Sequence, residues 1–309
     1  MANDRDETTA TSGPRRRTAL VTGASGGIGF EIARGLVERD HDVWMVSRPG
    51  PRGEEAAARL REGAGRDDAA IFLPADLASL AEVRRLAQEV AERVPRLDVL
   101  VHNAGIFAQR RELTEDGFER SFALNHLAPF LLTHLLTQSL RAAEAPRVVV
   151  TSSRAERAGA IDLERAASGV PYSGWLAYGW SKQANIHFVR ELGRRAPHPA
   201  LRAYAFHPGF VATDFGGGGG LMTAVIRLTQ RLFARKPAEG ADTGLWLATA
   251  EPAPDPSGGY FVDREPAQPS APARDDAMSR ELWVRSEAWV ALTEGERWPA
   301  PDAGGVGAG

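Results

Sequence analysis

The chain has 309 residues, of which 43% are hydrophobic and 25% charged, the balance of an ordinary globular protein. Its formal net charge of −3 argues against a nucleic-acid partner, and it contains no run of about 18 apolar residues that could span a membrane. Because cysteine is absent, disulfides and thiolate metal sites are excluded, and we expect a cytoplasmic location.

Short β-rich runs alternate with helical patterns along the chain. The predicted strands are 18–22, 42–47, 70–75, 98–102, 147–152, 201–206 and 259–263. The predicted helices are 28–39, 79–94, 117–143, 177–195 and 238–250. The strand runs are almost continuously apolar, as in parallel strands buried on both faces. The alternation predicts an α/β fold, a Rossmann-type doubly wound parallel sheet of about seven strands in a single domain.

The two ends of the chain and one internal segment break this alternation. Residues 1–17 and 294–309 are expected to be disordered tails of a catalytic domain that covers 18–293. Five glycines at 216–220 permit hinge-like backbone changes, and an amphipathic stretch follows them. We therefore expect residues 214–236 to form a mobile substrate flap. A fixed packed helix, a subunit interface and a membrane-surface helix are the alternatives.

A glycine-rich turn, TGASGGIG at residues 22–29, connects the first predicted strand to a helix. Backbone N–H groups of such a turn and of the helix N-terminus can bind a pyrophosphate. Gly23 would allow the tight turn, Gly27 close approach to the phosphates, and Gly29 close packing of helix and strand. A plain glycine turn is the alternative, because Ile32 stands where the third glycine of G-x-G-x-x-G would fall.

The end of the second predicted strand indicates which dinucleotide is bound. An NAD enzyme generally carries Asp or Glu there to hold the adenosine ribose, whereas this chain has Ser47 followed by Arg48. No carboxylate repels a 2′-phosphate and the Arg48 guanidinium can bind one, so NADP(H) is predicted, with NADPH preferred over NADH. Arg52 would add positive charge. The alternative is that Arg48 is a solvated loop residue.

Tyr178 and Lys182 stand four residues apart in a predicted helix and therefore share one face. An unperturbed tyrosine has a pKa of about 10 and exchanges protons poorly at neutral pH. A fixed ammonium nearby favours the phenolate, so we expect Lys182 to lower the pKa of Tyr178 towards the range of a general acid/base. By itself this YxxxK spacing is weak evidence, since any helix can contain it by chance.

Taken in order, these motifs resemble the short-chain dehydrogenase/reductase family over about residues 18–293. The family's catalytic serine usually lies about a dozen residues before the tyrosine, whereas Ser153 lies about twice as far from Tyr178. That interval is typical of the branch of retinol dehydrogenases and WW-domain oxidoreductases. Four further stretches resemble the same branch: LNHL (124–127), AYGWSKQANIHF (177–188), HPGFVATD (207–214) and the tail 257–287.

The resemblance implies an enzyme that interconverts a carbonyl and an alcohol on a hydrophobic small molecule. Ser153 would stabilise the substrate oxygen, and Tyr178 would exchange its proton. Lys182 would also bind the nicotinamide ribose, and Asn125 would help to hold a proton-relay water. Ser152 as the functional serine and a purely structural Asn125 are the alternatives. The resemblance further implies cofactor contacts from Ser25, Ile28, Asp76, Leu77, Asn103, Ala104, Gly105, Pro208, Gly209, Val211 and Thr213.

Two other function classes stay open, a catalytically idle NADP-binding regulatory or scaffold protein and a non-redox epimerase or dehydratase. The intact catalytic set argues against the first. Many retinol-dehydrogenase-like enzymes have an N-terminal membrane anchor, whereas residues 1–17 are polar, so retinoid specificity and membrane location do not transfer. A homodimer is left open. No metal is expected, because four scattered histidines are interpreted as packed or capping residues, His102, His126, His187 and His207.

Overall fold

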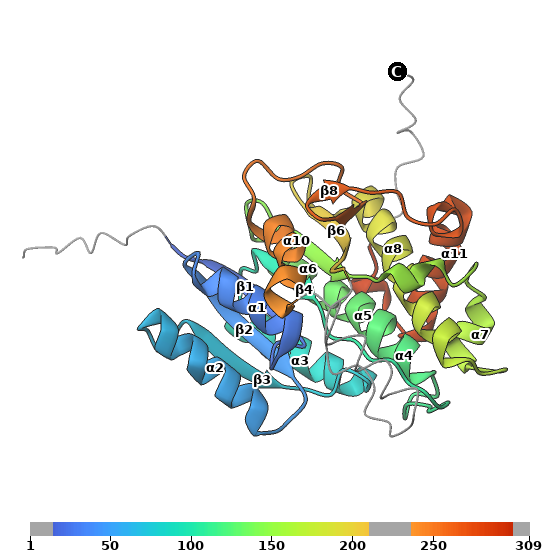
Figure 1. Cartoon of the computed structure of the whole chain (residues 1–309), viewed down its shortest axis with the longest axis horizontal. Coiled ribbons are helices and arrows are strands. Elements are labelled where there is room, and N and C mark those ends of the chain that lie inside the picture. The colour runs from blue at the N-terminus through green and yellow to red at the C-terminus, as the bar shows by residue number, and fades with distance from the viewer. Residues whose placement is uncertain (1–14, 210–235, 299–309) are drawn as a thin grey trace, which may run out of the picture.

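One sheet organises the part of the chain that the computed structural model describes, residues 15–209 and 236–298. Its strand order is β3-β2-β1-β4-β5-β6-β7-β8, with β1 to β7 parallel and β8 antiparallel to β7 (Figure 1). The strands are β1 (Arg17–Thr22), β2 (His41–Ser47), β3 (Ala70–Pro74), β4 (Val99–His102), β5 (Arg147–Thr151), β6 (Arg202–His207), β7 (Gly259–Val262) and β8 (Glu265–Pro266). The predicted Rossmann-type sheet is confirmed, and the two-residue β8 is added to the seven predicted strands.

Helices connect the strands and cover both faces of the sheet. They are α1 (Gly27–Val37), α2 (Pro51–Ala64), α3 (Leu80–Arg93), α4 (Arg120–Phe122), α5 (Ala128–Leu135), α6 (Thr137–Arg141), α7 (Leu163–Ser168), α8 (Gly174–Arg195), α10 (Pro237–Thr249) and α11 (Asp276–Trp289). The predicted helices did not include α2, α7 and α11. Within the described ranges, none of the helices combines the length and the apolar character needed to cross a bilayer.

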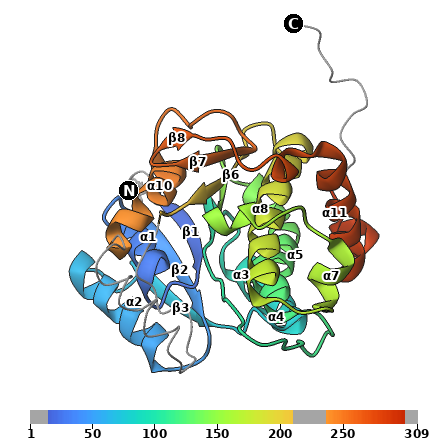
Figure 2. The ribbon, with the colours of Figure 1, turned by 45° about the vertical axis from the view of Figure 1, so that its right-hand side comes forward.

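Strands β1 to β7 each contribute to two apolar cores, because successive side chains of a strand point to opposite faces. In β1, Ala19 and Val21 pack into the core that α1, α2 and α10 cover. Leu20 packs into the other core, below α3, α5, α8 and α11. Figure 2 shows α10 beside α1 on one face, and α8 beside α11 on the other. This two-sided burial explains why the strands are apolar at nearly every position.

The ordered domain extends further at both ends than the sequence suggested. Arg16 pairs with Asp42 at 2.9 Å, and β1 already begins at Arg17. At the other end, Trp298 is only 5% exposed, and its Nε1 donates to Oγ1 of Thr137 at 2.7 Å. The predicted tail boundaries at residues 17 and 293 are therefore wrong by a few residues, because charge pairing and an aromatic contact hold these ends.

One predicted region falls outside the described residues. The predicted cofactor contacts Val211 and Thr213 lie between the two described ranges. So does the predicted substrate flap, apart from its last residue, Lys236, which caps α10. The flap stays a prediction, together with its alternatives.

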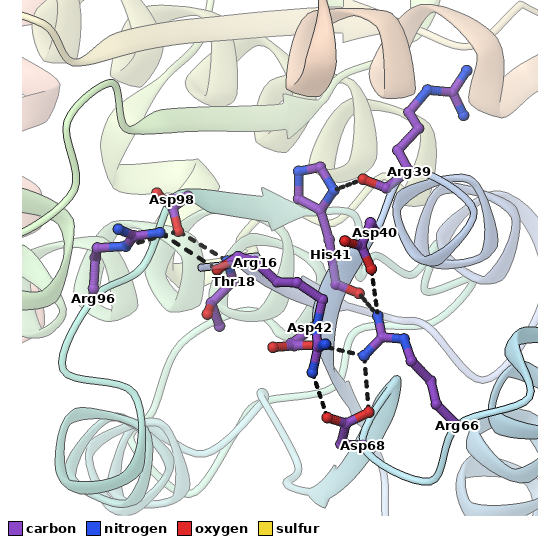
Figure 3. Close-up of polar contacts among 10 residues, drawn as sticks. All are labelled: Arg16, Thr18, Arg39, Asp40, His41, Asp42, Arg66, Asp68, Arg96 and Asp98. Carbon is purple, nitrogen blue, oxygen red and sulfur yellow. Dashed lines mark hydrogen bonds and ion pairs between the residues drawn. The ribbon is translucent and has the colours of Figure 1, made fainter. Parts of the chain in front are cut away.

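Charged side chains join the strands at their amino ends, the edge opposite the glycine-rich turn (Figure 3). Arg66 pairs with Asp42 at 2.6 Å and with Asp68 at 2.9 Å. Arg16 pairs with the same two carboxylates. The four residues form an alternating network across the ends of β1, β2 and β3, and we call it the amino-edge network.

Two largely buried side chains lie at the same edge. The carboxylate of Asp98 accepts a hydrogen bond from the backbone N–H of Thr18 at 2.9 Å, which ties β4 to β1. Arg147 is 2% exposed, and its guanidinium donates to the carbonyl oxygen of Ala250 at 2.6 Å and to Glu251 at 3.1 Å. Because the last carbonyls of a helix lack partners within it, Arg147 caps the C-terminus of α10.

Candidate active site

The glycine-rich turn leaves β1 and enters α1 with a backbone that needs glycine. Gly23 and Gly27 have φ values of +67° and +57°, in the left-handed region that disfavours side chains. A Cβ at Gly29 would lie 2.4 Å from the carbonyl oxygen of Gly23. At Gly26, the N-cap of α1, a Cβ would meet nothing within 4 Å. The turn therefore leaves open space before the free N–H groups of α1, and the residues present fit a pyrophosphate.

The segment after β4 supports this turn. Oγ1 of Thr22 accepts hydrogen bonds from the backbone N–H groups of Asn103 at 3.0 Å and Ala104 at 3.1 Å. The Asn103 side chain donates to the carbonyl oxygens of Thr22 at 3.2 Å and Gly23 at 3.3 Å. Its amide group is thus engaged by the protein, and Asn103 holds the glycine-rich turn in place.

The residues predicted for the adenosine end lie after β2 and β3. Arg48 and Arg52 are exposed, and neither side chain makes an ion pair or hydrogen bond with another described residue. Asp76 is half-buried, and its carboxylate accepts from the backbone N–H of Ala78 at 3.0 Å. Both arginines are free to receive an anion, whereas Asp76 shapes the turn after β3.

The other predicted cofactor contacts divide between the surface and the core. Ser25 is half-buried in the glycine-rich turn, and Pro208 and Gly209 are half-buried directly after β6. Ile28 and Leu77 are buried in the two cores, so their side chains pack against apolar neighbours. These two residues can reach a ligand through their backbone.

Asn125 lies in a wide, π-helical turn, Ala123–Leu127, within the stretch predicted as one helix over 117–143. The N–H of Ala128 bonds to the carbonyl of Ala123, five residues back. Proline explains this widening: Pro129 has no N–H for the Asn125 carbonyl four residues earlier, and its ring would clash with that carbonyl in an α-helix. The predicted helix is confirmed in part: helical segments follow one another from Arg120 to Arg141, but the wide turn interrupts their regular bonding, and Pro129 was the signal that could have shown it.

The wide turn directs the Asn125 amide into the site. Its Oδ1 accepts from the backbone N–H of Ile106 at 2.8 Å, and its Nδ2 donates to the Ile106 carbonyl at 3.0 Å. The same Nδ2 donates to Oγ of Ser181 at 2.9 Å, and Ser181 donates to the Tyr178 carbonyl at 2.7 Å. The side chain of Asn125 therefore connects the loop after β4 to α8.

The two serines after β5 have different surroundings. Ser152 is buried, and its hydroxyl donates to the carbonyl of Lys182 at 2.8 Å. Ser153 is half-buried, forms a hydrogen bond with the Tyr178 side chain and accepts from the N–H of Ala155 at 3.3 Å. The geometry favours Ser153 over Ser152 as the serine that meets a substrate.

Lys182 is 2% exposed, and its Nζ donates to the carbonyl of Thr151 at 3.1 Å. No carboxylate of the described residues pairs with it, and burial lowers the pKa of Lys182 to about 8. Nζ lies 5.7 Å from the ring centre of Tyr178, and a Cβ at Gly105 would be 3.2 Å from Nζ. The loop after β4 thus passes close to the ammonium at Gly105, where a side chain would crowd it.

The pKa of Tyr178 is raised, which corrects the expectation that Lys182 lowers it. Burial of the phenol is the larger cause, because it disfavours the charged phenolate, and the hydrogen bond with Ser153 opposes it. Tyr178 is therefore a neutral phenol at neutral pH, as an unperturbed tyrosine also is.

Several residues that support this site were not predicted. The ring of Phe107 packs edge-on against Tyr178, with ring centres 5.6 Å apart. The buried side chain of Gln183 donates to the carbonyls of Glu156 at 2.8 Å and Gly159 at 3.0 Å, and accepts from the N–H of Ile161 at 2.9 Å. Gln183 fixes the loop that carries Ser153. Its position directly after Lys182 could have marked Gln183 as a residue near the site, but the sequence does not show which backbone groups it bonds to.

Three of the four histidines singled out in the sequence are bonded to hydroxyl groups inside the protein. His102 meets Thr133 at 2.8 Å, His126 meets Ser286 at 2.9 Å, and His187 meets Ser279 at 2.8 Å. Burial lowers the pKa of these three histidines to about 3, 3 and 4, respectively. His207, the fourth, ends β6 and is also buried. Within the described ranges, no group of three histidine, aspartate or glutamate residues is arranged to hold a metal.

The fold and the site define a dinucleotide-dependent oxidoreductase, and the chain belongs to the short-chain dehydrogenase/reductase family. The family model for short chain dehydrogenase matches residues 17–218. The chain is 38% identical over 288 residues to retinol dehydrogenase 14 of Mus musculus, covering 89% of this chain and 86% of that one. It is 37% identical over 278 residues to the “Putative daunorubicin C-13 ketoreductase DnrU” of Streptomyces sp. (strain C5), covering 90% and 93%.

Solved structures show the same architecture. An uncharacterized protein from Mycobacterium paratuberculosis superposes with a TM-score of 0.71 at 35% identity, over 89% of this chain and 93% of that one. A short chain dehydrogenase from Shigella flexneri 2a strain 301, complexed with NADP, has a TM-score of 0.57 at 26% identity, over 76% and 92%. The predicted resemblance to the retinol dehydrogenase branch is confirmed.

Proposed function

We propose that this protein reduces a ketone or aldehyde on a hydrophobic small molecule to the alcohol, with NADPH as the reductant. The carrying observation is the hydrogen bond between the side chains of Ser153 and Tyr178, with Lys182 one turn further on the same helix face. Carbonyl reduction consumes a proton, and the hydroxyl of Tyr178 can donate it. The expected preference for NADPH favours reduction over alcohol oxidation.

When bound, NADPH supplies the hydride. The hydroxyls of Ser153 and Tyr178 both bind the carbonyl oxygen and orient it. As negative charge develops on that oxygen, Ser153 stabilises it by a hydrogen bond, and Tyr178 transfers its phenolic proton to it. The ammonium of Lys182 then stabilises the phenolate left on Tyr178. Carbonyl, hydride and proton together give the alcohol.

The residues that would hold the cofactor support NADP over NAD. Gly23, Gly27 and the N-terminus of α1 would receive the pyrophosphate, and Arg48 would receive the 2′-phosphate. Ser47 stands where a carboxylate would repel that phosphate. Lys182 would contact the nicotinamide ribose. The complex of the Shigella protein with NADP supports the same choice.

The names of the relatives support a hydrophobic carbonyl or alcohol as substrate. One is named a retinol dehydrogenase and the other a ketoreductase. We further propose a single catalytic domain and a cytoplasmic location, the latter supported by the absence of cysteine.

The test is a screen of ketones and aldehydes with the purified full chain, followed by NADPH absorbance and product analysis. We expect NADPH consumption equal to alcohol formed for at least one apolar carbonyl, and slower turnover with NADH. NADPH binding without turnover on the whole panel would favour the scaffold function. A changed substrate without net NADPH consumption would favour an epimerase or dehydratase.

A further inference from the structure

Ser153 is followed by a short 3-10 helical turn, Arg154–Arg157, that determines where its hydroxyl lies. The N–H of Ala155 donates to the Ser153 hydroxyl at 3.3 Å, and the N–H of Glu156 donates to the Ser153 carbonyl at 3.0 Å. The same hydroxyl forms a hydrogen bond with the Tyr178 side chain. Because the turn bonds to both the backbone and the side chain of Ser153, a shift of the turn would move that hydroxyl relative to Tyr178.

The carboxylate of Glu156 is completely buried, with an exposed fraction of 0%. It accepts hydrogen bonds from one distant residue, Ser270, whose backbone N–H lies 3.1 and 3.2 Å from its two oxygens and whose hydroxyl lies at 2.5 Å. The one basic group that pairs with it among the described residues is Arg157, at 3.3 Å, and that side chain is 60% exposed. Burying a carboxylate is costly unless hydrogen bonds satisfy it, so the position of Glu156 depends on Ser270.

A second carboxylate, that of Glu191, is equally buried but has a different environment. Two arginines of the same helix pair with it, Arg194 at 2.6 Å and Arg195 at 2.7 Å. Glu191 is thus neutralised within α8, whereas the bonds of Glu156 join segments 114 residues apart. An apolar side chain could fill the place of Glu156 without the cost of a buried charge. What the carboxylate adds is direction, since its hydrogen bonds fix the orientation of the turn.

The segment that carries Ser270, residues 267–274, is itself fixed to the fold, and we call it the C-terminal anchor. Its first residue donates its N–H to the Tyr260 carbonyl of β7 at 2.8 Å. Its last residue accepts at its carbonyl from the Arg190 side chain of α8 at 3.2 Å. Ser270 therefore meets Glu156 from a segment that is held at both ends.

The helix α8 holds the same turn through the backbone. The side chain of Gln183 donates to the carbonyl of Glu156 at 2.8 Å. A Cβ at Gly179 would lie 2.6 Å from the carbonyl oxygen of Ala155, so the helix passes directly against the turn one residue after Tyr178. The turn thus has two supports, α8 through its backbone and the C-terminal anchor through the Glu156 carboxylate.

We propose that Glu156 is a positioning residue for the reaction, and that the C-terminal anchor thereby places Ser153 against Tyr178. The inference rests on the proposed function, in which the Ser153 hydroxyl must meet the Tyr178 hydroxyl and the carbonyl oxygen at once. Glu156 acts through the turn, because its carboxylate is bonded to Ser270. A small displacement of a group that binds the reacting atoms lowers the rate by a large factor.

The test measures kcat and the KM for NADPH of the full chain, with the apolar carbonyl that the screen identifies as the best substrate. Glu156→Leu should lower kcat about tenfold and change the KM for NADPH less than about twofold. Glu156→Gln keeps the shape and can still bond to Ser270, so it should recover most of that loss. Glu191→Leu is the matched control, since it also removes a buried carboxylate, and it should keep the wild-type kcat.

A double-mutant cycle separates positioning from a general loss of structure. Ser153→Ala should lower kcat about a hundredfold. If Glu156 acts through the Ser153 hydroxyl, adding Glu156→Leu to Ser153→Ala should lower kcat by less than about a further twofold. A further tenfold loss in the double variant, or the same loss of kcat in Glu191→Leu as in Glu156→Leu, would overturn the inference. Should Glu156→Leu fail to fold, Ser270→Ala takes its place in the cycle, with an expected loss of about threefold.

Hydrogen exchange tests the same support without turnover. In Ser270→Ala, the amides of residues 155–158 should exchange faster than in the wild type, whereas those of α3 should exchange at the same rate. If the wild type reduces no carbonyl of the panel, the proposed function fails, and this measurement still decides on the support. Faster exchange in the turn supports the holding of Ser153 through Glu156, and unchanged exchange refutes it.

Discussion

The two edges of the sheet hold their polar groups in opposite ways. At the amino edge, Arg16 and Arg66 pair with Asp42 and Asp68, so positive and negative charges alternate. At the carboxyl edge, the buried ammonium of Lys182 has a carbonyl oxygen as its partner and no carboxylate among the described residues. The arginines of the amino edge are thus neutralised by carboxylates, whereas the ammonium of Lys182 at the carboxyl edge has no opposite charge beside it among the described residues.

This difference separates groups that hold the fold from groups placed for chemistry. A carboxylate beside Lys182 would hold its pKa high and would compete for the ammonium that Tyr178 needs once its proton has left. The amino edge has no such constraint, so its arginines are free to cross-link strands. The predictions below test whether the two edges can be changed independently, in order of decreasing effect.

Replacing the proton donor should have the largest effect. Tyr178→Phe is expected to lower kcat about a thousandfold and to leave NADPH binding unchanged, because it removes one hydroxyl. Stopped-flow absorbance and a fluorescence titration with NADPH measure the two quantities. The control is Tyr204→Phe, which also removes one phenolic hydroxyl. That hydroxyl lies away from the site and donates to the Pro254 carbonyl at 2.7 Å. Equal activity of Tyr178→Phe and wild type would refute the mechanism.

Removing the buried charge should damage function and improve stability. Lys182→Met is expected to lower kcat about a hundredfold and to weaken NADPH binding. It should also raise the midpoint of thermal unfolding, because burial lowers the pKa of Lys182 to about 8 and so disfavours the ammonium in the folded state. Calorimetry and the same titration test both parts. A lower midpoint in Lys182→Met would show that the ammonium stabilises the fold.

The same lysine predicts a pH dependence. Its ammonium is present below a pH of about 8 and is lost as the pH rises through that value. In the reductive direction, kcat/KM should therefore decline above about pH 8, with an apparent pKa that belongs to Lys182 and Tyr178 together. Lys182→Arg keeps its charge, so its declining limb should move to higher pH. An unmoved limb would assign the titration to another group.

Reversing the charge at the adenosine end should change cofactor choice by a smaller factor. Arg48→Asp is expected to shift the NADPH/NADH ratio of kcat/KM by about one to two decades towards NADH. Arg280→Asp makes the same charge change at an exposed position of α11 and serves as control. If both variants keep the wild-type ratio, Arg48 does not discriminate between the cofactors.

Breaking the amino-edge network should have the smallest effect and no catalytic one. Arg66→Met removes the pairs with Asp42 and Asp68, which are partly exposed, so we expect a loss of about 1 kcal/mol of unfolding free energy. That corresponds to roughly 2–4 °C in midpoint temperature. Denaturation in low and high salt should show the loss shrinking with ionic strength. Lys182→Met is expected to raise the midpoint temperature and Arg66→Met to lower it. Shifts of opposite sign would support the contrast between the two edges of the sheet, and a changed kcat in Arg66→Met would weaken it.

Features with local causes could be predicted from the sequence. The strands follow from apolar runs, the glycine-rich turn from backbone conformation, and the shared face of Tyr178 and Lys182 from helix geometry. Contacts between distant segments could not. The bond from Arg147 to the end of α10 and the return of Trp298 to Thr137 join residues more than a hundred positions apart.

The direction of the Tyr178 pKa shift also escaped prediction. The ammonium of Lys182 was expected to decide it, whereas burial proved the stronger influence. The extent of burial depends on how the loops after β4 and β5 close around the phenol, and the i, i+4 spacing carries no information about that closure. Local spacing thus showed which groups meet, and tertiary packing determined their protonation.

The wide turn at Asn125 also restricts which changes of chain length the protein can accept. The turn holds one residue more than regular α-helical bonding would use, with Ala128 bonded to Ala123. Deleting one residue there would let the helix close regularly and would keep the residues beyond it on their present faces, because the residue removed is the extra one. Inserting a further residue would instead rotate everything beyond it by about 100°. Phe130 would then leave its contact with Trp283, where the ring centres are 5.1 Å apart. The packing beyond the wide turn can therefore absorb a single-residue deletion in that turn, but not an insertion.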